Sequence, residues 1–339
     1  MNDSRPGLAA PRLARLVREA VERCRLDLSG TVVLTEAATG PYVVTPVIAA
    51  LAGAQVIAVT APTRYGTVDQ VTRATLELAG SLGVAQRISV AEHRSAELFG
   101  RADIITNSGH VRPIVDEFAA AVRSDAVIPL MFESWEIEAG RLDIELNGLL
   151  RKGVQIAGTN ERHPHVDVFS FLGPMAVAQL ADAGISAYRG RIALLCDNPF
   201  EEFLVGGLKG AGADVLASTD IAELFDGPTP DALVVALRPT GRPVPLNAGD
   251  LAARWPAVPV LQFWGDIDRA ALAVAQVPYW PIEAPGAGHM GVLPSRVGPE
   301  PIVRLQAGGL KVAQVLRLPA AARTTDDLNY VDELLIGNR

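Results

Sequence analysis

The sequence predicts an α/β protein with two doubly wound domains, each with a parallel sheet, joined by a long helix. From Thr31 the chain reads TVVLTEAATG, PYVVTPVIAALAGA and QVIAVTA, which is an apolar run, a glycine turn, an amphipathic stretch and a second apolar run. The same order returns from Arg191 in RIALLCDNPF, EEFLVGGLKGAGA and DVLAST. Parallel sheets bind ligands beyond the carboxyl ends of their strands, so the loops at those ends are where we look for function.

The composition is that of an ordinary globular protein with room for two cores. Hydrophobic residues make up 49% of the 339 residues and charged residues 20%. The net charge of −8 argues against a nucleic-acid partner, which usually needs a basic surface. Cys24 and Cys196 are too few for a disulfide framework. The start of the chain has no signal core and no apolar run is long enough to span a membrane, so we expect a cytoplasmic protein.

The first set predicts a complete domain over residues 1–165, including an N-terminal amphipathic helix over 10–24. Glycine turns and helical patterns separate its strands. The expected strands are Val32–Leu34, Val56–Val59, Ile88–Val90, Ala102–Thr106, Ala126–Met131 and Val154–Ala157.

An apolar helical stretch over 166–186 is the expected connector, and the second set then predicts a substrate domain over 187–316 that ends in a closing helix. Residues 317–339 are charged, which predicts a peripheral tail. The strands expected in the second domain are Ile192–Cys196, Val215–Ala217, Ala232–Ala236, Val258–Phe263 and Tyr279–Pro281.

Neither first turn carries G-x-G-x-x-G, the glycine fingerprint that brings a pyrophosphate to a helix N-terminus. In the first domain the turn is TEAATGPYVVT, where Thr39 or Gly40 is placed to cap a helix that faces a phosphate. The next strand ends in VTAPTRYGT, where such domains hold the adenine ribose. Thr60 and Arg64 suit a 2′-phosphate and no acid follows the strand at once. We therefore predict NADP, with NAD as the alternative, although Arg64 also fits a solvated loop.

The strand ADIITNSGH resembles the ADIV-type strand of Rossmann dehydrogenases, ornithine cyclodeaminase-like proteins among them. This resemblance implies two Rossmann-like domains and places Asn107 and Ser108 along the cofactor. The tandem layout is also broadly similar to the adenosylhomocysteine hydrolase and 2-hydroxyacid dehydrogenase group, whose glycine motif is absent here.

Three residues are candidate acids or bases. His110 and His289 carry imidazoles, which titrate near neutral pH, and Glu133 lies close to Trp135 in a setting that can raise a carboxyl pKa. His110 is equally compatible with a cap or an exposed loop, and Glu133 with the start of a helix. His289 lies in the glycine-rich loop APGAGHMGVLPSRVGPEP.

The candidate substrate-binding residues are polar side chains at strand ends and one arginine suited to a carboxylate: Asn160, Arg162, Asn198 and Arg296. His163 and His165 alone do not make a metal site, so no metal is predicted.

Two lobes around an interdomain cleft predict an NAD(P)-dependent oxidoreductase that acts on a small polar, carboxylate-bearing substrate. A non-redox enzyme (a lyase, hydrolase or cyclase) that uses the same cleft stays open, as does a cytosolic small-molecule-binding protein. We expect a homodimer on the base rate for such enzymes.

Overall fold

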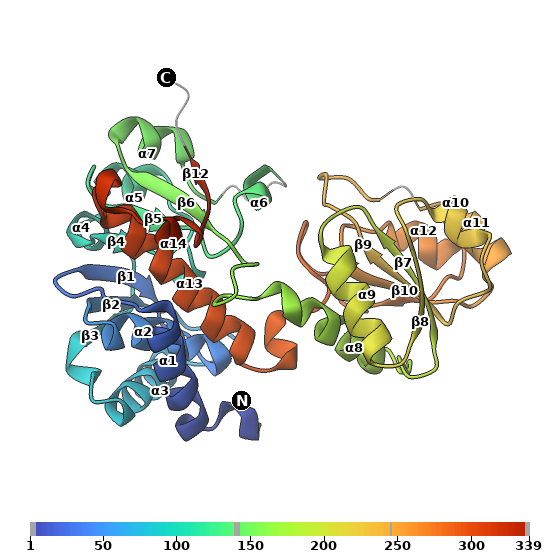
Figure 1. Ribbon diagram of the computed structural model, residues 1–339, viewed down its shortest axis with the longest axis horizontal. Coiled ribbons are helices and arrows are strands. Elements are labelled where there is room, and N and C mark those ends of the chain that lie inside the picture. Colours follow the sequence, from blue (N-terminus) through green and yellow to red (C-terminus); the bar gives the residue numbers. More distant parts are fainter. Residues whose placement is uncertain (1–4, 139–142, 245, 336–339) are drawn as a thin grey trace. The chain divides into compact units, whose positions relative to one another are not determined.

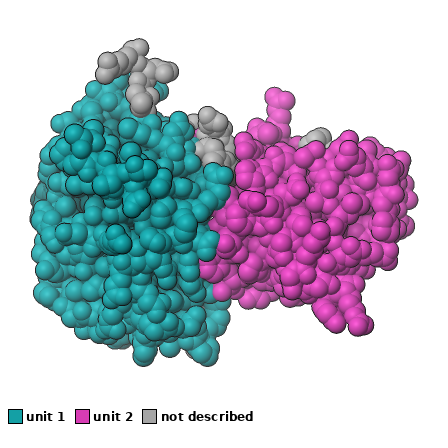
Figure 2. Space-filling view, in the orientation of Figure 1, with its two compact units in different colours: residues 1–136, 142–168, 298–339 teal, residues 137–141, 169–297 magenta. Residues whose placement is uncertain are grey.

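The computed structural model describes residues 5–138, 143–244 and 246–335, and the chain divides into two compact units (Figures 1 and 2). Unit 1 is built from the chain before Phe169 and after Val297, and unit 2 chiefly from Phe169–Val297. The predicted fold class is confirmed, because each unit has a largely parallel sheet with helices packed on it.

The unit 1 sheet has the strand order β12-β6-β5-β4-β1-β2-β3. Strands β1 to β6 are parallel, and β12 pairs with β6 in the antiparallel direction. The order reverses between β1 and β4, which is the switch point where doubly wound sheets bind ligands. The strands are β1 (Val32–Glu36), β2 (Gln55–Val59), β3 (Ile88–Ala91), β4 (Ile104–Ile105), β5 (Val127–Pro129), β6 (Gln155–Thr159) and β12 (Val331–Leu335).

Unit 1 owes its main core to amphipathic helices that lie against this sheet. Helix α1 buries Leu13, Leu16, Val17 and Ala20, a helical spacing that puts them on one face. They share one core with residues of α2 and α13. The helices that precede or follow the strands are α1 (Ala10–Cys24), α2 (Val44–Leu51), α3 (Val68–Ser81), α4 (Ala96–Arg101), α5 (Asp116–Ala121), α6 (Trp135–Glu138), α7 (Leu146–Lys152), α13 (Glu300–Arg317) and α14 (Thr325–Leu328).

Unit 2 has a parallel sheet of different order, β11-β10-β9-β7-β8. Numbered within the unit this is 2-1-3-4-5, the flavodoxin-like order. Its strands are β7 (Arg191–Cys196), β8 (Asp214–Ser218), β9 (Ala232–Ala236), β10 (Val260–Trp264) and β11 (Tyr279–Trp280). Its helices are α8 (Leu172–Asp182), α9 (Phe200–Gly210), α10 (Ile221–Phe225), α11 (Ala248–Arg254) and α12 (Arg269–Val274).

The stretch over 166–186 was predicted to be a connector helix between the two domains, but its helical part belongs to unit 2. This part, α8, crosses α9 so closely that a Cβ on Gly173 would meet the Gly207 Cα at 2.5 Å. Glycine on both helices permits this approach, and the resulting packing fixes α8 to unit 2.

The positions of the closing helix and of the tail also differ from the prediction. We expected the helix within the domain over 187–316, but α13 lies in unit 1, where Ile302, Val303 and Leu310 join the core. The tail over 317–339 was expected to be peripheral, yet its residues 331–335 form β12 and extend the unit 1 sheet. The local periodicity of the sequence does not reveal that the chain leaves unit 1 and later returns to it. Among the described residues, no helix is long and apolar enough to cross a bilayer.

Candidate functional site

A pocket of about 380 Å³ lies at the carboxyl edge of the unit 1 sheet. Its walls come from the ends of β2 and β3 and from the loop after β4, which are neighbours of the switch point. The lining residues that matter below are Thr60, Glu92, His93, Arg94, Gly109, His110 and Arg112. Thr60 and His110 were predicted site residues, and the structure brings them together.

Thr60 supplies a hydroxyl with no protein partner. Its backbone N–H donates to the Ala91 carbonyl, which continues the β2–β3 ladder, and its side chain is fully buried. The Oγ1 atom makes no hydrogen bond within the described part of the chain. A buried hydroxyl without a partner costs free energy, and a ligand in the pocket can provide the missing bond.

Glu36 ends β1 at the same edge and is 6% exposed. Its carboxylate lies against Gly109, because a Cβ built on Gly109 would fall 1.5 Å from the Glu36 Oε2. Burial raises the pKa of Glu36 to about 7, and the positive charge of Arg112 opposes that rise. Burial therefore favours the protonated form of Glu36 far more than in a solvated carboxyl.

Two arginines hold the loop after β4 and give the pocket positive charge. Arg94 donates from Nη1 to the Pro113 carbonyl at 2.8 Å and lies over the Phe118 ring. Arg112 pairs with Asp143 at 2.9 Å. Burial and the charge of Arg94 both lower the pKa of His110, so its imidazole is neutral at neutral pH.

Asn107 and Ser108 are buried in the strand-end network rather than open to the pocket. The Met131 N–H donates to the Asn107 Oδ1, which ties the loop after β4 to β5, while Asn107 Nδ2 has no hydrogen-bond partner among the described residues. Ser108 shares a hydrogen bond with Thr106, whose hydroxyl donates to Thr35 on β1. These bonds hold β1 and β4 together at the switch point.

A second group of predicted residues gathers at the ends of β5 and β6. Glu133 is 2% exposed and pairs with Arg162 at 3.3 Å between Oε1 and Nε. Asn160 accepts from the Arg162 backbone N–H and donates from Nδ2 to the Asn329 carbonyl. The candidate acid and two candidate substrate ligands therefore form one cluster, which Asn329, just before β12, partly anchors.

The turn that was predicted to bind the cofactor has a glycine at a positive φ but lacks the predicted threonine cap. Gly40 has a φ of +64°, which glycine adopts readily, and it opens a short 3₁₀ helix (Gly40–Val43) that runs into α2. The Thr39 side chain makes no capping hydrogen bond to that helix. Arg64 is exposed, donates to the Tyr65 hydroxyl at 2.6 Å and lies over its ring. Arg64 does not line the pocket.

In unit 2 the predicted residues have structural partners of their own. Asn198 accepts from the Phe200 N–H and donates to the Ala236 carbonyl, so it fixes the turn after β7. Arg296 makes two hydrogen bonds to Asp182 on α8. His289 is exposed in a loop that the Trp264 indole anchors at Gly288.

The first turn of α9 carries Glu201 and Glu202, so a bound anion at that helix end would meet two negative charges.

Sequence reasoning missed His93, Arg94 and Arg112 as pocket residues. HRS after β3 and VRP after β4 look like ordinary solvated loops in the sequence. Only the spatial strand order brings the ends of β3 and β4 to the same pocket. Glu36 ends the first apolar run of the sequence, and its burial is not apparent from the sequence. Among the described residues, no group of three or more His, Cys, Asp or Glu side chains is placed to hold a metal ion.

No family model matches the chain, and no curated protein matches it. Solved structures do. A dipicolinate synthase subunit from Bacillus halodurans is 11% identical with a TM-score of 0.52, and the alignment covers 86% of this chain and 100% of that one. NAD⁺-bound 3-phosphoglycerate dehydrogenase from Entamoeba histolytica is 10% identical with a TM-score of 0.50, covering 88% and 99%. Dipicolinate synthase from Bacillus subtilis is 10% identical with a TM-score of 0.50, covering 84% and 95%. At these identities the likeness shows a shared two-domain Rossmann-like fold.

Proposed function

We propose that the chain is an NAD(P)-dependent oxidoreductase and that unit 1 binds the dinucleotide. The observation that carries this proposal is the pocket beyond β2 and β3, whose lining residues include two arginines and Thr60, a residue with a buried, unpartnered hydroxyl. This is the place where a doubly wound sheet holds the adenine ribose. The similar fold of a dehydrogenase solved with NAD⁺ supports the same choice of ligand.

The residues fit the adenosine half of the ligand well. Thr60 can donate to or accept from a ribose hydroxyl, and Arg94 and Arg112 favour a phosphate near the pocket mouth. His110 lies in this same pocket, so we assign it to ligand binding rather than to proton transfer as the sequence suggested. Arg64 is replaced as the phosphate ligand by Arg94, because Arg94 lines the pocket and Arg64 does not.

The other half of the ligand would extend past the switch point toward β4 and β5. Asn107 Nδ2 and the Glu133–Arg162 pair are the polar groups at those strand ends. The nicotinamide ring, when bound, supplies or accepts a hydride. Glu133 and Arg162 would then orient a small polar substrate, and we propose a carboxylate-bearing one because Arg162 offers a guanidinium at 48% exposure.

A titration of nicotinamide fluorescence with NADPH and with NADH tests the proposal. We expect binding of at least one of them below millimolar concentration, and a failure of both would refute it. The hydroxyl of Thr60 gives a sharp variant, since Thr60→Val should weaken binding about threefold to tenfold, the value of one hydrogen bond. Thr75→Val is the matched control. Thr75 is equally buried with an unpartnered Oγ1, but it lies on α3 and does not line the pocket.

A non-redox enzyme is the second candidate, and one observation favours it. Glu36 stands at the end of β1, where the glycine fingerprint of dinucleotide-binding domains begins, and it brings a carboxyl to the expected pyrophosphate site. Absorbance at 340 nm separates the candidates. Turnover of bound NADPH with a panel of small 2-oxo acids supports the oxidoreductase, and bound nucleotide with no turnover on any of them favours the alternative.

A further inference from the structure

The buried carboxyl at the switch point is the feature of unit 1 that the proposed function leaves unexplained. A dinucleotide carries negative charge on its pyrophosphate, and the first turn of a doubly wound sheet is where that charge lies. This chain has Glu36 at the end of β1 and a single glycine, Gly40, in the turn that follows.

We propose that Glu36 makes unit 1 a proton-linked site, one that binds an anionic nucleotide when the Glu36 carboxyl is protonated and releases it when the carboxyl ionises. This inference rests on the proposed function, since it concerns the same ligand at the same edge of the sheet. In this proposal Glu36 sets how the affinity for the nucleotide depends on pH.

The geometry keeps the carboxyl in place. Glu36 is hydrogen-bonded into the β1–β2 ladder opposite Val59, and its side chain is packed against Gly109. Gly109 has a φ of +37° and no side chain, and it also lines the pocket. Gly109 therefore contacts the Glu36 carboxyl and also lines the pocket.

The carboxyl also lacks the partners that would keep it ionised. Among the described residues, no hydrogen bond or ion pair reaches the Glu36 side chain, and Arg112 acts on it only through its charge. Arg112 is itself paired with Asp143, which weakens that effect. Burial without a partner favours the neutral form, which places no negative charge beside a bound phosphate.

Other charged groups around the pocket also respond to an anion, and they must be separated from Glu36. Arg94 and Arg112 carry guanidinium groups, which attract an anion. His110 and His93 carry imidazoles, and Glu92 is an exposed carboxylate of the pocket rim. The pKa of His110 is lowered, so its protonation would change affinity below neutral pH and not above it.

The test is calorimetric titration of the full chain with NADH and NADPH between pH 7 and 8.5, in buffers of different ionisation enthalpy. The charge of both nucleotides is constant in this range, because a phosphate monoester loses its last proton near pH 6. We expect proton uptake on binding, approaching one per ligand, and a dissociation constant that rises up to about tenfold per pH unit. Glu36→Gln should bind with no proton uptake and with an affinity that is the same at both ends of the range.

Two matched variants should keep the pH dependence of the wild type. They are Glu92→Gln, which removes the carboxylate among the pocket-lining residues, and His93→Gln, which removes an imidazole. Glu36→Ala is the second variant at the key position, and it should also lose the pH dependence.

Wild-type binding with a constant affinity and no proton uptake would overturn the inference, and so would a pH dependence that survives in Glu36→Gln. Both results leave the proposed function standing, since they require a bound nucleotide. If neither the wild type nor Glu36→Gln binds either nucleotide at any pH, the proposed function fails and the inference falls with it.

Discussion

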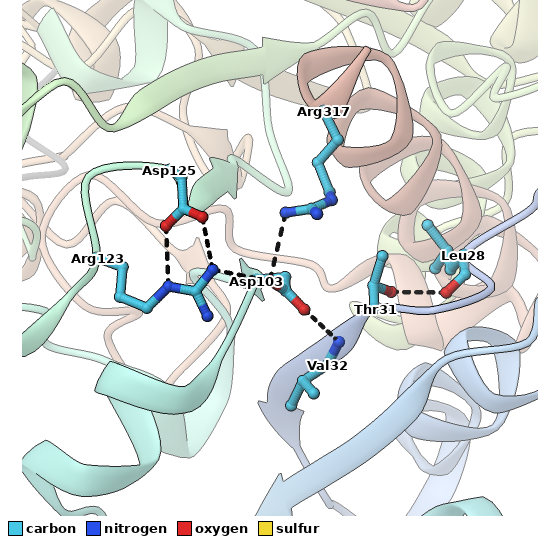
Figure 3. A network of polar contacts seen from close by, with 7 residues as sticks. All are labelled: Leu28, Thr31, Val32, Asp103, Arg123, Asp125 and Arg317. Carbon is cyan, nitrogen blue, oxygen red and sulfur yellow. Dashed lines mark hydrogen bonds and ion pairs between the residues drawn. The ribbon is translucent and has the colours of Figure 1, made fainter.

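The two edges of the unit 1 sheet each hold a carboxyl in a largely buried place, and the two carboxyls are treated in opposite ways. At the amino edge, Asp103 accepts from the Val32 backbone N–H at 2.8 Å and pairs with Arg123 at 3.1 Å and Arg317 at 3.6 Å (Figure 3). At the carboxyl edge, Glu36 has no hydrogen-bond or ion-pair partner within the described part of the chain.

The contrast teaches how one fold separates stability from binding. Ion pairs and a backbone hydrogen bond satisfy Asp103, so it holds the start of β1 against the segment before β4. Glu36 is left unsatisfied at the edge where parallel sheets bind ligands, and a group kept at a cost there is a candidate for function. Substitutions at one edge of the unit 1 sheet at a time separate these two roles.

The largest effect is expected from Asp103→Ala, which should lower the free energy of unfolding by about 3 kcal/mol. The change removes the acceptor of the Val32 N–H and leaves two arginines without this partner. Asp103→Asn keeps an oxygen for the N–H and should cost about half as much. Urea unfolding at pH 7 measures both, and a loss below about 1 kcal/mol for Asp103→Ala would contradict the structural role.

The next effect concerns the contact between Gly109 and the carboxyl. Gly109→Ala should lower the free energy of unfolding by about 2 kcal/mol, because the new Cβ collides with the Glu36 carboxylate and the φ of +37° disfavours a side chain. The double variant with Glu36→Ala supplies the control. Its loss in the free energy of unfolding should be smaller than the sum of the losses in the two single variants. Simple additivity would show that the two residues do not touch.

Glu36→Gln is expected to stabilise the protein, by up to about 3 kcal/mol at pH 8. The pKa of Glu36 is raised from 4.5 to about 7 in the folded state, so ionisation opposes folding as pH rises from 4.5 through 7. Below pH 4.5 both states hold the proton and the effect should vanish. Urea unfolding of wild type and variant at pH 4.5 and pH 8 measures the difference. Equal stability at pH 8 would mean that the carboxyl is well solvated or paired.

The sequence predicted the sheets better than it predicted the site. Every expected strand exists, because short apolar runs between glycine turns identify buried parallel strands without long-range information. Helix α13 was misplaced for the opposite reason. Its apolar residues predict a buried helix, but nothing local says which of two cores the helix will join.

The pocket shows the same limit at the level of single residues. Thr60 and His110 were predicted from strand ends, yet Arg94 was not, since its place beside His110 depends on the β2–β3 pairing and on its hydrogen bond to Pro113. Arg64 looked equally suitable in sequence and turned out to contact Tyr65. Side-chain direction in a loop is set by such tertiary contacts, and charge and spacing alone do not reveal it.

The smallest effect should come from Arg317→Ala, about 0.5 kcal/mol at low salt and less at 1 M salt. Its 3.6 Å pair with Asp103 is partly exposed, and Arg123 still neutralises that carboxylate. Arg101→Ala is the matched control, because the Arg101–Glu97 pair has the same 3.6 Å separation and lies farther out in solvent. Comparable small losses for both arginines, beside the large loss for Asp103→Ala, would assign the strength of the amino edge to the Val32 hydrogen bond and the Arg123 ion pair. A loss for Arg317→Ala close to that of Asp103→Ala would instead make the Arg317 ion pair the main support of that edge.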